Sequence, residues 1–161
     1  METRVARFHN VYGPLGTYEG GKEKAPAALS RKIALAKDGD EIEVWGDGKQ
    51  TRSFMYIDDC LEGIFRLMHS DYHEPLNLGT DRLITINDLI DLIARIAAKT
   101  IRKRHDLSKP QGVRGRNSDN TKMREVLGWE PQVPLEKGME ITYRWIEGEL
   151  RKAGRIPRVE A

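Results

Sequence analysis

The spacing of apolar residues along the chain changes repeatedly between that of a strand and that of a helix, which predicts a mixed fold. Residues 3–11 alternate and carry Val5, Phe8 and Val11, so we expect them to form one buried strand. The Tyr12-Gly13-Pro14 turn closes this strand, because glycine and proline favour a change of chain direction.

Residues 26–37 predict a helix. A proline stands in its first turn, and Leu29, Ile33 and Leu35 recur at helical spacing before Asp38-Gly39 ends it. Runs with alternating or β-prone residues predict further strands at residues 41–46, 51–57, 74–80 and 100–107. The last of these is expected at a sheet edge.

Later segments predict four more helices. Asp58 and Asn87 stand where N-caps belong, so we interpret them as caps rather than as ligands. In the helix that follows Asp58, the residues expected on one face are Leu61, Ile64, Phe65 and Met68. The other helices are expected within residues 83–100, 118–129 and 134–154.

The composition fits one globular core rather than two. The chain has 161 residues, of which 39% are hydrophobic and 32% charged. The 27 basic and 25 acidic residues nearly balance, and the basic stretch 101–116 lacks interleaved aromatic residues, so no nucleic-acid partner is expected. Cys60 is the single cysteine, which excludes an internal disulfide. With no apolar run of membrane-spanning length, we expect a cytoplasmic protein without a membrane partner.

Polar residues gather in four stretches at strand ends or in loops, namely residues 8–14, 21–28, 45–54 and 112–119. In an α/β sheet, ligands bind where loops leave the carboxyl ends of strands, so these stretches are expected to meet at one crevice. Arg52, Arg114 and Arg116 suit a diphosphate, because a planar guanidinium pairs with two oxygens. The alternative is that these arginines form ion pairs with Asp58, Asp59 or Asp119.

Several strings occur in an order that resembles a known family. RFHNVYGP, WGDGKQTRSFMYIDD and NLGT are similar to the extended short-chain dehydrogenase/reductase family, in its NAD-dependent epimerase/dehydratase branch. GGKEKAPAALSRK, GDGKQTRSF, GVRGRNSDN and GMEITYRWI resemble its GDP-mannose 3,5-epimerase subfamily. The resemblance runs from about Arg4 to Glu149. It implies an α/β fold, in which the chain supplies the last parallel strands of a Rossmann-type epimerase and a small α/β substrate-binding domain.

The resemblance also implies that residues 1–161 are a single substrate-binding portion. Family members are much longer, and the dinucleotide-binding half that precedes this region binds NAD and carries a tyrosine-lysine pair and a catalytic cysteine. The N-terminal METRVARFHN leads directly into a predicted strand, which agrees with a beginning in mid-protein. We therefore expect NAD to be bound by a half that is absent here, and the isolated chain to be inactive.

By the same resemblance, Lys24 is the catalytic acid/base group that acts on the sugar opposite that cysteine. The substrate is expected to be GDP-mannose or a related nucleotide sugar. The residues expected to bind it are Asn10, Glu23, Lys24, Ala25, Lys32, Gln50, Thr51, Arg52, Ser53, Arg114 and Arg116. A lysine removes protons only when its pKa is lowered, and Glu23 would oppose this unless it faced a sugar hydroxyl.

Two features are interpreted as unrelated to catalysis. Tyr18 and Lys22 match the Tyr-x-x-x-Lys spacing of the family, but two adjacent glycines between them disfavour the helix that this motif requires. Cys60 is expected to be a buried packing residue.

Two other functions stay open. The chain could belong to another nucleotide-sugar epimerase or a 4,6-dehydratase, or it could be a sugar-nucleotide-binding module without chemistry. The strand at residues 3–11 would expose apolar surface without its neighbours, so we expect the lone chain to self-associate or to pair with an N-terminal half.

Overall fold

The structure is a computed structural model that describes residues 1–157; the last four residues of the 154–161 tail lie outside the described residues. Its helices are α1 (Ala25–Leu35), α2 (Ile57–Met68), α3 (Ile86–Ile96), α4 (Thr121–Leu127) and α5 (Leu135–Lys152). Its strands are β1 (Ala6–Phe8), β2 (Val11–Tyr12), β3 (Glu41–Trp45), β4 (Thr51–Arg52), β5 (Met55–Tyr56), β6 (Leu76–Leu78), β7 (Ile84–Thr85), β8 (Arg102–Asp106) and β9 (Gly115–Arg116). Strands and helices thus mix along the chain as the apolar pattern predicts.

The strands form small sheets in which most neighbours are parallel. β1 pairs with β6, β2 with β5 and β3 with β8, each in parallel orientation. β4 lies between β7, which is antiparallel to it, and β9, which is parallel. This arrangement confirms the α/β fold class with parallel strands.

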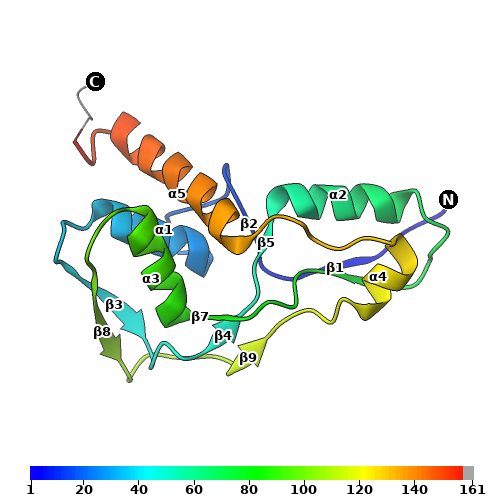
Figure 1. The fold of residues 1–161 in the computed structure, drawn as a ribbon, viewed down its shortest axis with the longest axis horizontal. Coiled ribbons are helices and arrows are strands. Elements are labelled where there is room, and N and C mark those ends of the chain that lie inside the picture. Colours follow the sequence, from blue (N-terminus) through cyan, green and yellow to red (C-terminus); the bar gives the residue numbers. More distant parts are fainter. Residues whose placement is uncertain (158–161) are drawn as a thin grey trace.

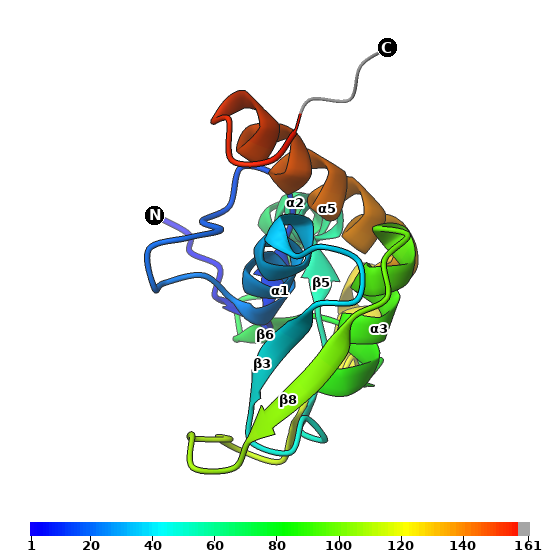
Figure 2. The ribbon, with the colours of Figure 1, turned by 90° about the vertical axis from the view of Figure 1, so that its left-hand side faces the viewer.

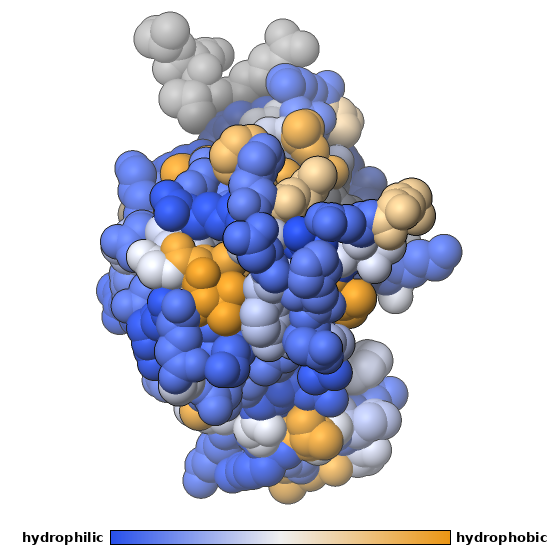
Figure 3. Space-filling view, turned by 90° about the vertical axis from the view of Figure 1, so that its right-hand side faces the viewer, coloured by the Kyte–Doolittle hydropathy of each residue, from blue (hydrophilic) through white to orange (hydrophobic). Residues whose placement is uncertain are grey.

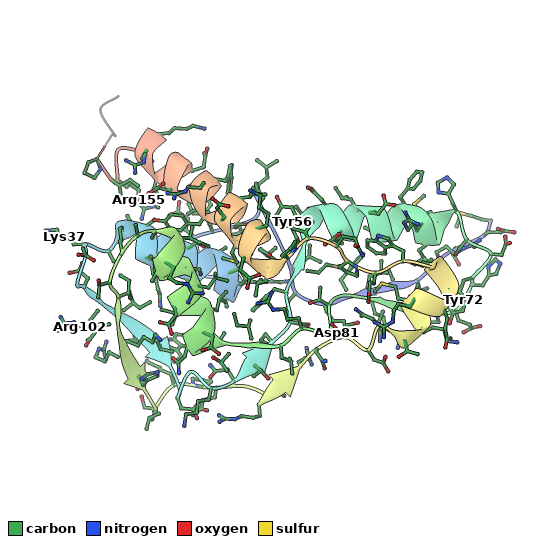
Figure 4. The ribbon with its side chains drawn as sticks, viewed as in Figure 1. Lys37, Tyr56, Tyr72, Asp81, Arg102 and Arg155 are labelled. Carbon is green, nitrogen blue, oxygen red and sulfur yellow. The ribbon has the colours of Figure 1, made fainter. Side chains whose placement is uncertain are left out.

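The molecule is elongated, with two groups of elements (Figure 1). α1, α3, β3 and β8 lie at one end, and α5 packs along α1 and α3; Figure 2 shows β3 and β8 side by side next to these helices. α2, α4, β1 and β6 form the other end. Tyr56 stands between the groups, where β5 continues into α2 (Figure 4).

Each group has its own apolar core. The larger core joins α1, α3, α5 and β3, and it contains the fully buried Ile33, Ile93 and Tyr143. The smaller core lies under α2 and α4 and includes Cys60 and Met123. Burial raises the pKa of the Cys60 thiol, so the interpretation of Cys60 as a packing residue is confirmed.

The prediction of one buried strand at residues 3–11 is wrong. The chain breaks at Asn10, whose φ of 32° lies in the left-handed region, and passes from β6 as its partner to β5. Val5 and Phe8 are 47% and 53% exposed. They stay exposed because, among the described residues, β1 has β6 as its one strand neighbour.

The apolar residues expected on one face of α2 do not form its buried face. Leu61, Phe65 and Met68 are 57%, 60% and 65% exposed, and Ile64 is only partly buried. Cys60, Gly63 and Leu67 face the core instead. Gly63 lets α2 lie close to this core, because a Cβ at this position would make a tight contact of 3.1 Å with the Trp129 ring. Figure 3 views this end of the molecule, where apolar side chains interrupt a hydrophilic surface.

Both predicted N-caps are wrong. α2 begins at Ile57, before Asp58, and it has no side-chain cap. α3 is capped by Thr85, whose hydroxyl accepts a hydrogen bond from the backbone N–H of Asp88 at 3.0 Å. Asn87 lies inside α3 and donates its amide hydrogen to the carbonyl of Asp47. The predicted strand at residues 51–57 is likewise divided, into β4 and β5.

Candidate functional site

Two neighbouring cavities lie at the N-terminal end of α1. The first has a volume of about 250 Å³ and is lined by Asn10, Lys24, Ala25, Gln50, Arg52, Phe54, Ile86 and Gln111. The second has a volume of about 460 Å³ and is lined by Gly21, Glu23, Ala25, Ala28, Leu29, Lys32, Glu43, Val44, Trp45, Gln50 and Ile86. Ala25, Gln50 and Ile86 line both. The cavities are therefore adjacent, and one elongated ligand could occupy both.

Three of the predicted loops meet at the first cavity. Asn10 lies at the break between β1 and β2, and its amide donates to the carbonyl of Ser53 at 3.0 Å. Lys24 is the N-cap residue of α1, and its carbonyl accepts the N–H of Ala28 at 2.9 Å. Arg52 comes from β4. The expected meeting of residues 8–14, 21–28 and 45–54 is thus observed.

The first cavity carries positive charge. Within residues 1–157, Lys24 and Arg52 form no ion pair with a carboxylate; Arg52 donates to the carbonyls of Thr51 and Val113 at 2.7 and 2.8 Å. Arg116 is the register partner of Arg52 on β9 and has no carboxylate partner in the described chain either. Two arginines of neighbouring strands are therefore free to meet an anion.

The third arginine is different. Arg114 donates to the carboxylate oxygens of Asp47 at 2.8 and 3.1 Å. This arginine therefore forms an ion pair, which was the alternative to binding a diphosphate. The partner differs from the three predicted candidates, which were Asp58, Asp59 and Asp119. Asp59 is instead buried and accepts the backbone N–H groups of Gln132 and Val133.

Glu23 faces the protein rather than open solvent. Its carboxylate accepts the N–H of Gly21 at 2.7 Å and the guanidinium of Arg31 at 3.1 Å, and its side chain is 10% exposed. Hydrogen bonds from the backbone N–H groups of Glu23 and Gly21, together with Arg31, lower the pKa of this carboxyl group. Glu23 lies beside the second cavity with its charge balanced by Arg31.

Gln50 and Ser53 present buried polar atoms. The Gln50 amide donates to the carbonyl of Trp45 at 3.2 Å, whereas its Oε1 and the Ser53 hydroxyl make no hydrogen bond within the described part of the chain. Thr51, Ser53, Arg114 and Arg116 line neither cavity. The remaining seven predicted site residues line one or both.

The second cavity is also lined by Glu43 and Trp45, which the sequence did not mark as site residues. Lys32 of α1 donates to the backbone carbonyl of Glu43 at 3.3 Å and so bridges α1 and β3. Trp45, at the end of β3, is 53% exposed. Trp45 opens the polar stretch 45–54, which was a usable signal, whereas Glu43 lies within an ordinary alternating strand.

The Tyr-x-x-x-Lys spacing is not helical here, as predicted. Gly20 and Gly21 have φ values of 94° and 84°, and the Tyr18 ring packs edge-on against Trp145.

No group of three His, Cys, Asp or Glu residues suits a metal ion in the described region. No described helix is long and apolar enough to cross a membrane. The helices α2 and α3 follow β5 and β7 directly, without the glycine-rich turn that typically binds a dinucleotide.

Comparison with known proteins gives three kinds of similarity. The NAD dependent epimerase/dehydratase family matches residues 1–79. "GDP-mannose 3,5-epimerase" of Arabidopsis thaliana is 47% identical over 152 residues, which are 94% of this chain and 40% of that protein. "GDP-mannose 3,5-epimerase 1" of Oryza sativa subsp. indica is 48% identical over the same share of this chain. "UDP-glucuronic acid decarboxylase 5" of Arabidopsis thaliana is 36% identical over 88% of this chain.

Solved structures of nucleotide-sugar epimerases share the fold. UDP-glucose 4-epimerase from Thermotoga maritima, solved with UDP-glucose, superposes with a TM-score of 0.83 at 30% identity and covers 91% of this chain. UDP-glucuronic acid 4-epimerase from Bacillus cereus, in complex with UDP-glucuronic acid and NAD, gives a TM-score of 0.78 at 28% identity over 91% of this chain. The chain spans 46% and 45% of these two structures, and about 40% of the relatives above.

Proposed function

Because residues 1–79 match the NAD dependent epimerase/dehydratase family, we propose that this chain is the substrate-binding portion of an enzyme of that family that epimerises GDP-mannose. The observation that carries the proposal is the pair of adjacent cavities. One presents Lys24 and Arg52 without carboxylate partners in the described chain, and the other has mainly apolar walls. A nucleotide sugar is divided in the same way, since its diphosphate is charged and its base is uncharged.

The first cavity receives the sugar and diphosphate. The Arg52 guanidinium supplies the paired N–H donors that a diphosphate requires, and its register partner Arg116 on β9 adds positive charge outside the cavity lining. The Asn10 amide group donates to Ser53, which leaves the Asn10 carbonyl oxygen to accept a hydrogen bond from a sugar hydroxyl. Gln50 lies where the two cavities meet and can contact either end of the ligand.

Lys24 moves a proton at the sugar ring. Epimerisation beside a ketone requires one group to remove a proton from carbon and a second group to return a proton on the opposite face. Lys24 is the N-cap residue of α1 and lines the first cavity. The carboxylate of the neighbouring Glu23 forms an ion pair with Arg31. Cys60 of α2 is buried and lines neither cavity, so the second group is proposed to come from outside this chain.

The rest of the enzyme supplies the dinucleotide. NAD, bound by residues outside this chain, provides the reversible oxidation that makes the neighbouring sugar protons acidic. The isolated chain binds substrate but is inactive. Its N-terminal partner packs on the exposed apolar residues of β1 and α2, including Phe8, Leu61 and Phe65.

Calorimetric titration of the purified chain with GDP-mannose and UDP-glucuronic acid tests this proposal. We expect saturable binding of GDP-mannose, weakened at least tenfold in Arg52→Ala. Arg102→Ala, at an exposed arginine of β8 outside both cavities, is the matched control and should bind normally. Lys24→Ala should change affinity little, since its role is proton transfer. No binding, or equal loss in both arginine variants, would contradict the assignment of the site.

A further inference from the structure

The second cavity has the features of a slot for a flat ring. Small and branched apolar side chains of α1 form one wall, from Ala25, Ala28 and Leu29. Trp45, at the end of β3, also lines the cavity, and this residue is 53% exposed. A nucleobase has two apolar faces and a polar edge, so it stacks on an aromatic ring without regard to which base it is. The choice among bases depends on the polar groups that meet the edge.

Trp45 is held in place from two sides. Its indole N–H donates to Glu43 Oε1 at 2.9 Å, and its backbone carbonyl accepts the Gln50 amide at 3.2 Å. Gln50 and Glu43 both line the cavity. The indole hydrogen bond orients the ring before a ligand arrives, which lowers the ordering cost of binding.

Glu43 is the polar group that stands beside this ring. The indole of Trp45 and the guanidinium of Arg104, the latter at 2.9 Å from Oε2, orient its carboxylate and lower its pKa. Each carboxylate oxygen engages one of these donors and keeps a further lone pair. At neutral pH Glu43 therefore accepts hydrogen bonds and donates none.

We propose that Glu43 reads the edge of the base and selects guanine, with Trp45 as the stacking platform; this inference rests on the proposed function. Guanine presents two adjacent donors, N1–H and the 2-amino group, which match the two oxygens of a carboxylate. Uracil presents one N–H between two carbonyl oxygens, so one carboxylate oxygen would face an acceptor. Glu43 favours guanosine diphosphate sugars by attraction and disfavours uridine diphosphate sugars by repulsion.

The test compares three nucleoside diphosphates on the full 161-residue chain. Inosine diphosphate is the informative probe, because it differs from GDP only in lacking the 2-amino group. We expect calorimetry to show that GDP binds about tenfold more tightly than inosine diphosphate. The ratio of the GDP affinity to the UDP affinity should be at least as large. Indole fluorescence should fall on GDP binding, and Trp45→Phe should remove most of that change.

Two variants distinguish base reading from loss of an ion pair. Glu43→Gln should bring the affinities for GDP and inosine diphosphate within about threefold. Glu41→Gln is the matched control, since Glu41 lies on the same face of β3 and pairs with Arg104 at 3.2 Å but lines neither cavity. Glu41→Gln should keep the full GDP preference.

The outcomes separate this inference from the function on which it rests. Equal affinity for GDP and inosine diphosphate in the native chain, or an unchanged preference in Glu43→Gln, would overturn the role of Glu43 and leave the nucleotide-sugar site standing. Binding of none of the three diphosphates would contradict both.

Discussion

Glu23 and Arg31 form an ion pair of 3.1 Å across the first turns of α1. The same carboxylate accepts the N–H of Gly21, and the Arg31 guanidinium also donates to the carbonyl of Tyr18 at 2.9 Å. These bonds fasten the loop between β2 and α1 to the helix, and Lys24 is the last residue of that loop. The pair of ionisable residues at 23 and 24 thus combines a loop anchor with a side chain that faces the cavity.

The first prediction concerns this anchor. Glu23→Ala and Arg31→Met should each lower the free energy of unfolding by about 1–3 kcal/mol, because each leaves a partly buried charge without its partner. The double variant should lose less than the sum of the two, since both remove one interaction. Urea unfolding of the four proteins measures this coupling.

A second ion pair on the same loop serves as the control. Glu19 pairs with Arg155, which lies beyond α5 (Figure 4), and the two side chains are 49% and 38% exposed. Exposed pairs contribute at most about 1 kcal/mol, so Glu19→Ala should change stability far less than Glu23→Ala. Equal effects of Glu19→Ala and Glu23→Ala would show that Glu23 is not a special anchor.

The second prediction concerns the C-terminal end of α1. Lys99 donates to the carbonyls of Ile33, Ala34 and Ala36 at 2.8, 2.9 and 2.6 Å, which satisfies groups that a helix end leaves unpaired. Lys99→Met keeps the length of the side chain and removes the donors, so we expect a loss of about 1–3 kcal/mol in unfolding free energy. Lys152→Met, at an exposed lysine, is the control. Unchanged stability in Lys99→Met would mean that solvent satisfies these carbonyls equally well.

Regular apolar patterns with clear end signals were predictable from the sequence. α1 and β3 are found almost where predicted, because a first-turn proline and Asp38-Gly39 mark the ends of α1 and a short alternation marks β3. The break at Asn10 was not predictable, since apolar spacing carries no information about a positive φ. The buried face of α2 was not predictable either, because packing buries Cys60, Gly63 and Leu67 rather than the larger apolar residues of the helix.

The site was partly predictable because three of its loops carry unusual clusters of polar residues. The pairing of Arg114 with Asp47 joins residues 67 positions apart, which local sequence cannot reveal. Glu43 was missed because its spacing is that of any strand residue, and its chemistry becomes visible only when α1 packs beside β3. Long-range packing, rather than residue type, thus determined both of these outcomes.

The third prediction is a dependence of stability on pH. Arg82 donates two hydrogen bonds to Glu136, at 2.8 and 2.5 Å, and lowers the pKa of Glu136 from 4.5 to about 2. Because the folded pKa lies below the unfolded one, this contribution is present above pH 4.5 and is lost as the pH falls toward 2. Glu136→Gln should reduce the acid sensitivity of thermal unfolding in that window. A native-like acid dependence in Glu136→Gln would assign the effect to other carboxylates.

The fourth prediction concerns the exposed apolar face of α2, formed by Leu61, Phe65 and Met68. Val5 and Phe8 of the β1 segment are also exposed at this end of the molecule. Apolar patches of this kind on an unpartnered helix mark an interaction surface. Without another partner, two copies of the chain should bury these faces against each other.

Phe65→Glu tests this association, because a charge placed in the centre of the face would have to lose its hydration on contact. In sedimentation velocity the native chain should gain apparent mass as its concentration rises, and Phe65→Glu should remain near 18.4 kDa. Leu107→Glu, at a 69% exposed leucine that follows β8, is the control and should behave like the native chain. The contrary result is a native chain that stays monomeric at every concentration and unfolds in one sharp, concentration-independent transition. That result would mean that the exposed face of α2 does not drive association. The apolar side chains of α2 would then be ordinary surface residues rather than a contact for a missing partner.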